Sequence, residues 1–88
     1  MDLSKFLKEK RIQAGLSQGD VAKKLGYTSP QFISNWERGL ARPPVTTIRK
    51  LAQIYKIDTD EMFDVVLKST VDDLTVELTE KFYKQEKR

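Results

Sequence analysis

The amino-acid sequence predicts an all-α fold, and two observations support that prediction. Apolar residues recur at intervals of three and four along nearly the whole chain, which is the period of one helix face, whereas the alternation typical of strands is scarce. Isolated glycines and the adjacent Pro43 and Pro44 separate these periodic segments, as expected for loops between helices. The 88 residues have room for one domain with a modest core, or at most two.

The composition excludes several classes of function. The chain contains neither histidine nor cysteine, so it lacks the commonest general base, any disulfide and the ligands of nearly every structural zinc site. All four glycines are isolated, which leaves no Gly-rich phosphate loop. We therefore expect no enzyme, no metal, no cofactor and no small-molecule ligand. Membrane-helix and secretion-signal patterns are also missing, so the cytoplasm is the expected location, without a membrane partner.

Charge is distributed unevenly along the chain. Residues 1–57 contain eleven Lys and Arg against four acidic residues, a net +7, whereas residues 58–88 contain five against nine, a net −4. Together these values give the overall charge of +3. A basic front and an acidic back suggest that only the front meets a polyanion, although a merely solvated, lysine-rich surface would give the same counts.

The first two helices have recognisable boundaries. The first is expected to end near Gly15, and its buried stripe comprises Leu3, Phe6 and Leu7. Ser17 offers an N-cap for the second helix, with Asp20 three residues later as its partner in a capping box. Gly26 suits the left-handed conformation that closes a helix, and the residues facing inward before it are Val21, Ala22 and Leu25.

The third helix is expected to begin at Thr28 or Ser29, with Pro30 in its first turn. Gln31 lies three residues after Thr28, which makes a second capping box possible. The helix is expected to end at Gly39.

Two successive prolines then make a loop before the fourth helix. This helix is expected from Thr46 to Tyr55, and its buried residues are Ile48, Leu51, Ala52 and Tyr55. Helix resumes after it, with Asp58 or Thr59 as the N-cap.

The exposed face of the third helix carries mostly uncharged polar side chains. Ile33 and Trp36 are three residues apart and point inward, which leaves the opposite side to Gln31, Ser34, Asn35 and Arg38. Glutamine and asparagine can both donate and accept, so they can pair with N6 and N7 of adenine in the major groove of DNA. Phosphate contacts only position a protein, because every sequence offers the same phosphates. The amides are therefore candidate base readers, although they could also be solvated helix residues.

A set of short motifs gives this region a family resemblance. The motifs are Gly15-Leu16-Ser17-Gln18, then Val21-Ala22 with Leu25-Gly26, then Ile33-Ser34 with Glu37-Arg38-Gly39. At this spacing, about residues 3–63 resemble the lambda-repressor-like helix-turn-helix family, often called the Xre family. The resemblance implies five packed helices, of which the second and third form the helix-turn-helix, and sequence-specific binding to double-stranded DNA.

The resemblance also assigns roles to individual residues. The positions that match the groove contacts of the family are Ser29, Pro30, Gln31, Phe32 and Asn35. Those expected near DNA phosphates are Ser17, Gln18, Arg38 and Arg42, with Gln18 alternatively supporting Gln31. Arg11 and Glu37 match a structural ion pair that joins the first helix to the third.

Two features weaken the match at the start of the third helix. The turn GYTS is one residue longer than in the shortest family members, and Pro30 occupies a position often held by a polar reader. A proline can touch a thymine methyl but cannot specify a base by hydrogen bonding, so specificity would depend more on Gln31 and Asn35. Phe32 could likewise meet a thymine methyl, or it could pack beneath Trp36 in the core.

The acidic C-terminal segment lies outside the resemblance. We divide the chain into a DNA-binding domain, residues 1–67, and an extension, residues 68–88, with a fresh helix start suggested by Ser69 and Asp72. An apolar stripe at spacings of three and four runs from Val66 or Leu67 through Val71, Leu74, Leu78 and Phe82, and the last four are the predicted dimer interface. The stripe could fold back on the domain, pair with a second copy or bind another protein. Residues 75–79, TVELT, alternate with period two and could instead form a short dimer strand.

These observations favour a transcriptional regulator that binds operator half-sites as a homodimer, with the third helix in the major groove. Repression is expected rather than activation, because it needs only occupancy of a promoter. The alternative is an antitoxin or adaptor whose C-terminal tail engages another protein. Pro30 and the acidic tail favour that alternative, whereas Gln31, Asn35 and the basic front oppose it.

Overall fold

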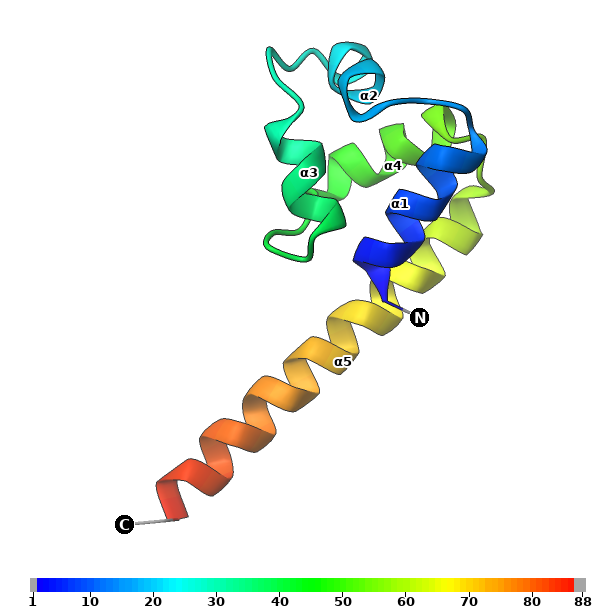
Figure 1. Ribbon diagram of the computed structural model, residues 1–88. Coiled ribbons are helices and arrows are strands. Elements are labelled where there is room, and N and C mark those ends of the chain that lie inside the picture. Colours follow the sequence, from blue (N-terminus) through cyan, green and yellow to red (C-terminus); the bar gives the residue numbers. More distant parts are fainter. Residues whose placement is uncertain (1, 87–88) are drawn as a thin grey trace.

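The computed structural model of the protein describes residues 2–86, and within them five α-helices form the whole of the regular structure. They are α1 (Leu3–Gln13), α2 (Gln18–Leu25), α3 (Gln31–Glu37), α4 (Val45–Ile54) and α5 (Thr59–Glu86). Figure 1 shows α1 to α4 and the start of α5 gathered into one small bundle, from which the rest of α5 projects. The predicted all-α class with five helices is confirmed.

Most helix ends follow the predicted capping chemistry. The side chain of Ser17 accepts the backbone N–H of Asp20 while the Asp20 carboxylate accepts that of Ser17, so the capping box is complete. Gly26 closes α2 with a φ of 85°, a left-handed conformation that costs glycine little. The Asp58 carboxylate accepts the backbone N–H of Glu61 and so caps α5.

The start of α3 differs from the prediction. The helix begins at Gln31, and Pro30 is its N-cap residue rather than part of its first turn. A proline disfavours the helical conformation in the residue before it, which excludes Ser29 from the helix. The hydroxyl of Ser29 instead accepts the backbone N–H of Gln31, at 3.3 Å. The capping box proposed for Thr28 and Gln31 does not form.

One hydrophobic core joins all five helices. It contains every residue predicted to be buried in α1 and at α4, together with two residues of α2, two of α3 and Met62 of α5: Leu3, Phe6, Leu7, Val21, Ala22, Ile33, Trp36, Ile48, Leu51, Ala52, Tyr55 and Met62. Leu25 is only partly buried and packs against the edge of this cluster. Because α3 contributes only Ile33 and Trp36, its opposite side is presented outward.

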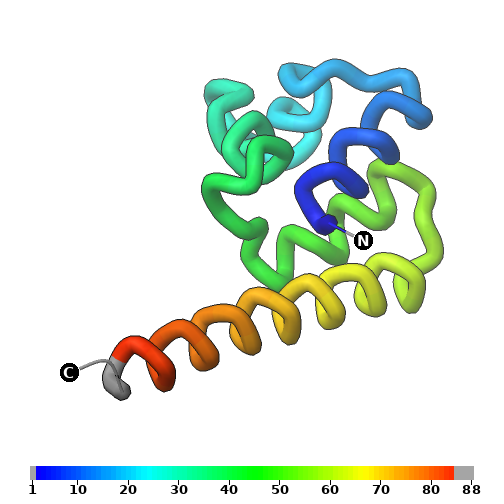
Figure 2. Tube along the Cα trace, turned by 60° about the horizontal axis from the view of Figure 1, so that its bottom comes forward, coloured from blue at the N-terminus to red at the C-terminus, as the bar shows by residue number. Residues whose placement is uncertain are grey.

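The C-terminal segment is one continuous helix, which corrects two predictions. No new helix begins at Ser69, and residues 75–79 are helical rather than a strand. The sequence contains neither glycine nor proline after Pro44, so nothing interrupts the backbone hydrogen bonds of α5. The Thr70 hydroxyl donates to the carbonyl of Val66, across the predicted boundary. Figure 2 shows this single helix running past the bundle and away from it.

Candidate nucleic-acid interface

The outward face of α3 is positioned by its two buried residues. Ile33 is 1% exposed and Trp36 is 4% exposed, so the short helix cannot rotate without opening the core. Gln31 lies on the exposed side, while Ser34 and Asn35 are half-buried at its edge. The helix follows α2 after a short turn and lies at the edge of the bundle (Figure 1). This is the arrangement that presents the second helix of a helix-turn-helix to a groove.

The two amides predicted to read bases are joined to each other. The Nε2 of Gln31 donates to Oδ1 of Asn35 at 3.0 Å, one helical turn away. The bond leaves Oε1 of Gln31 as an acceptor and Nδ2 of Asn35 as a donor. Adenine presents the complementary pair in the major groove, a donor at N6 and an acceptor at N7. The two side chains can therefore act as one preorganised reading unit.

An aromatic row lies beside these amides. The ring centroid of Phe32 lies 4.8 Å from that of Tyr27 and 6.5 Å from that of Trp36. Phe32 nevertheless remains 55% exposed. Phe32 thus packs on aromatic neighbours without joining the core, and the rest of its ring is exposed.

Arg11 and Glu37 form an ion pair between α1 and α3 whose side chains are 11% and 3% exposed. Nε and Nη2 of Arg11 donate to the two Glu37 carboxylate oxygens at 2.7 and 3.0 Å, a two-pronged geometry, and Nη1 donates to the carbonyl of Leu16. The hydrogen bond to Glu37 raises the pKa of Arg11, against the opposing effect of burial. Burial raises the pKa of the nearby Tyr55 phenol.

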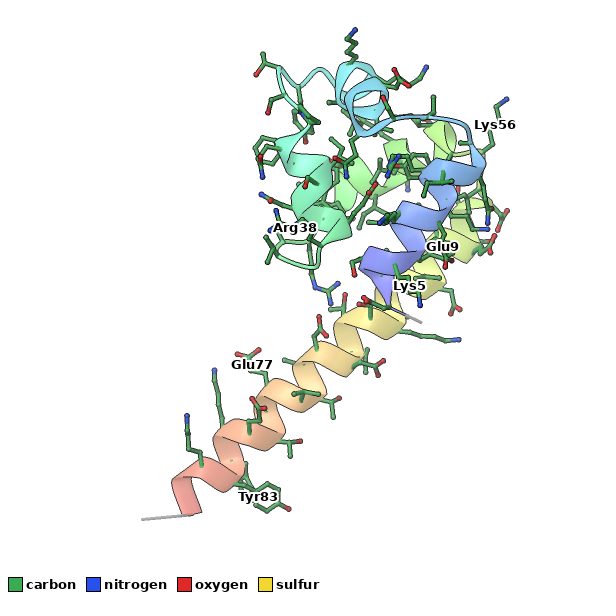
Figure 3. All side chains as sticks on the ribbon, viewed as in Figure 1. Lys5, Glu9, Arg38, Lys56, Glu77 and Tyr83 are labelled. Carbon is green, nitrogen blue, oxygen red and sulfur yellow. The ribbon has the colours of Figure 1, made fainter. Side chains whose placement is uncertain are left out.

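Gln18 belongs to the same network. Its Nε2 donates to Oε1 of Glu37 at 3.0 Å, so it supports the end of α3 through Glu37 rather than through Gln31. Ser17 is an exposed residue and its hydroxyl caps α2. Arg38 is exposed and terminates α3 (Figure 3). Ser17 and Arg38 thus remain accessible to a phosphate.

Arg42 contacts the protein itself, which the sequence did not indicate. Its guanidinium donates to Ser69, to the hydroxyl of Thr70 and to the carboxylate of Asp73, all on α5. The predicted phosphate ligand is therefore already engaged in this structure. The Ser-x-x-Asp pattern of Ser69 and Asp72 lies beside these acceptors, but a local pattern cannot indicate a partner 27 to 31 residues earlier in the chain.

The apolar stripe of α5 is uncovered. Every large apolar side chain from Leu67 to Tyr83 is at least 46% exposed, including the predicted members Val71, Leu74, Leu78 and Phe82. The stripe begins beside the bundle with Phe63, which is 60% exposed. It does not fold back onto the domain, and Figure 3 shows Glu77 and Tyr83 on the part of α5 that projects away from it.

The charge asymmetry of the sequence becomes a spatial separation. The basic residues of the first 57 positions lie on the bundle, whereas the projecting part of α5, residues 70–86, contains five acidic residues against two lysines. A polyanion would be attracted to the bundle and repelled by the projecting helix. The described helices include none that is long and apolar enough to cross a membrane.

The fold and this surface define a helix-turn-helix DNA-binding domain. The family model described as Helix-turn-helix matches residues 7–62, and the chain belongs to this lambda-repressor-like family. Among curated proteins, the HTH-type transcriptional regulator ImmR of Bacillus subtilis (strain 168) is 38% identical over 76 residues, which cover 84% of this chain. The match spans 59% of the length of that relative.

Proposed function

We propose that the protein is a transcriptional repressor that binds double-stranded DNA as a homodimer, each copy placing α3 in the major groove of one half-site. The observation that carries this proposal is the pair of linked amides, Gln31 and Asn35, on the outward face of the second helix of a helix-turn-helix. The relative described as a transcriptional regulator supports the regulatory role. Repression requires only that the bound protein occupy a promoter.

The reading surface divides into base-contacting and phosphate-contacting residues. Gln31 and Asn35 would specify an adenine, while Ser29, Pro30 and Phe32 would contact neighbouring bases, with Pro30 and Phe32 suited to thymine methyl groups. Ser17 and Arg38 would bind backbone phosphates on either side of the helix. Gln18, Arg11 and Glu37 would hold α3 in position without touching DNA.

Dimerisation is proposed through the apolar stripe of α5. Its members form three pairs that are each eleven residues apart, Phe63 with Leu74, Leu67 with Leu78 and Val71 with Phe82. An eleven-residue period corresponds to about 3.67 residues per turn, close to that of a straight α-helix, so the stripe stays on one side of α5. Two copies could cover their stripes by pairing nearly straight helices, and two linked domains could then read two half-sites.

Selection of bound sites from a random duplex library at near-physiological salt tests this function. A palindrome with half-sites about one helical turn apart is expected. Binding without enrichment of any sequence would mean that the basic bundle holds DNA only as a polyanion. Sedimentation of the free protein tests the dimer independently of DNA.

A second candidate function has support from the same projecting helix. An exposed apolar stripe on an acidic helix also suits an antitoxin or adaptor that binds another protein through its tail, with DNA contact secondary. A protein that stays monomeric in sedimentation and selects no DNA sequence would favour this candidate.

A further inference from the structure

Helix α5 leaves the bundle at a definable point. Its first part packs against α4 and α1, with Met62 buried and Val65, Val66 and Ser69 partly buried. From Thr70 to Lys84 every residue is exposed. The direction of the projecting helix is therefore set by the contacts of this first part, and those at Ser69 are the last before α5 leaves the bundle.

Arg42 binds α5 at this point. Its Nη2 donates to the carbonyl and the hydroxyl of Ser69, both at 3.1 Å, and to the Asp73 carboxylate. Its Nη1 donates to the Thr70 hydroxyl at 3.2 Å. Because that hydroxyl donates its own proton to the carbonyl of Val66, its oxygen is left to accept from Arg42.

The other end of this link is fixed to the reading helix. Arg42 lies in the loop that begins directly after α3, and the next residue, Pro43, is buried. At the start of the same loop, Gly39 approaches the side chain of Ser4 at the N-terminus of α1. A planar guanidinium with several fixed acceptors resists rotation better than a single ion pair, because each bond restrains a different direction.

We propose that Arg42 is a positioning residue that fixes the direction of α5 relative to α3 and thereby sets the half-site spacing that the dimer accepts. This inference rests on the proposed function, since it requires dimerisation through α5 and recognition through α3. It departs from the phosphate role predicted for Arg42. If α5 could change its direction relative to the bundle, the two α3 helices of a dimer could reach half-sites at several spacings. If that direction is fixed, one half-site spacing is favoured.

Substitutions on the two sides of the link separate these roles. If Arg42 positions α5, Arg42→Ala removes the whole link, and Asp73→Ala, which leaves the bonds to Ser69 and Thr70, weakens it in the same direction but by less. If Arg42 binds a phosphate, Arg42→Ala weakens binding to all sites alike, while Asp73→Ala leaves binding unchanged or tightens it by removing a competing anion. Lys68→Ala is the matched control. It also removes a positive charge near the point where α5 leaves the bundle, but the Lys68 side chain pairs with Asp64 and not with Asp73.

The first experiment measures affinities for the selected palindrome with its spacer lengthened or shortened by one and two base pairs. Wild type and Lys68→Ala should prefer one spacing. In Arg42→Ala that preference should fall about two-fold to thirty-fold, the range expected when each of two protomers loses one solvent-exposed ionic contact, and in Asp73→Ala it should fall by less. An unchanged spacing profile in either variant would overturn the inference, as would a uniform loss confined to Arg42→Ala.

The second experiment measures, without DNA, how widely the position of α5 varies relative to the bundle. Because the described chain contains no cysteine, spin labels can be placed selectively at Lys50→Cys on α4 and Thr79→Cys on α5, both exposed positions. The labelled protein is diluted with unlabelled protein so that distances within one copy dominate. We expect a narrow distance distribution in the otherwise wild-type protein and a broader one with Arg42→Ala or Asp73→Ala. Distance distributions of equal width in wild type and the variants would refute the positioning role, even if the protein binds a specific DNA site as a dimer. A wild-type protein that selects no DNA site from the random library would instead refute the proposed function.

Discussion

Removing Glu37 should destabilise the protein far more than removing a surface charge. Its side chain is 3% exposed and accepts two hydrogen bonds from Arg11 and one from Gln18. Glu37→Ala would leave the Arg11 guanidinium, itself 11% exposed, with only the carbonyl of Leu16 as an acceptor. Breaking a buried pair in this way costs about 3–5 kcal/mol. A domain of this size is stable by only about 4–13 kcal/mol, at ~0.05–0.15 kcal/mol per residue.

Chemical denaturation followed by the fluorescence of Trp36, the single tryptophan, measures this loss at a fixed protein concentration. Arg11→Met alone should be as costly as Glu37→Ala, because it strands the buried carboxylate. The double variant Arg11→Met with Glu37→Leu should recover most of the loss, since apolar residues can replace a buried pair at little cost. Lys68→Ala breaks the exposed pair with Asp64 and should change stability by about 0–1 kcal/mol.

Two results would refute this reasoning. One is a loss in Glu37→Ala as small as that in Lys68→Ala, which would mean that water or relaxation compensates the stranded arginine. The other is a double variant whose loss equals the sum of the losses in Arg11→Met alone and Glu37→Leu alone, which would mean that the two charges act independently.

Three further predictions concern the cap, the tail and the phosphate contacts. Hydrogen bonding from Ser17 lowers the pKa of Asp20, so the stability that the carboxylate contributes is present above the unfolded pKa of about 3.9 and is lost as pH falls through the folded pKa. Between about pH 5 and pH 3, wild type should therefore lose more stability than Asp20→Asn. Equal losses of stability in the two proteins over this range would contradict the prediction. Leu74→Glu with Leu78→Glu should give a folded monomer in sedimentation, and a persisting dimer would exclude the α5 stripe as the interface. Arg38→Ala should weaken binding to all duplexes alike and reduce the salt slope by about one, whereas a sequence-selective loss would argue against a phosphate contact.

Local chemistry made the helical domain largely predictable. The capping box of Ser17 and Asp20, the left-handed Gly26 and the stripes of α1 and α4 each depend on residues close together in sequence. The start of α3 was misplaced because the restriction that Pro30 imposes on Ser29 outweighs the capping potential of Thr28.

Contacts between distant residues were less accessible to prediction. The Arg11 and Glu37 pair is predicted only by the family resemblance. The resemblance predicts that Gln18 binds a phosphate or supports Gln31, whereas Gln18 donates to Glu37. The link between Arg42 and Asp73 depends on where α5 leaves the bundle, which no local pattern specifies. The tail was expected to begin a new helix at Ser69, because a capping pattern inside a continuous helix looks the same as one at its start.

The most direct test of base reading by α3 is a parallel selection of sites from one random duplex library with wild type and with Gln31→Ala. We expect wild type to enrich a palindrome and Gln31→Ala to enrich the same palindrome with one A·T position per half-site degenerate, because Gln31 and Asn35 together match adenine. Both half-sites of the palindrome should lose their base preference at the same position. Recovery of one identical motif from both proteins would contradict the assignment of base reading to this helix face.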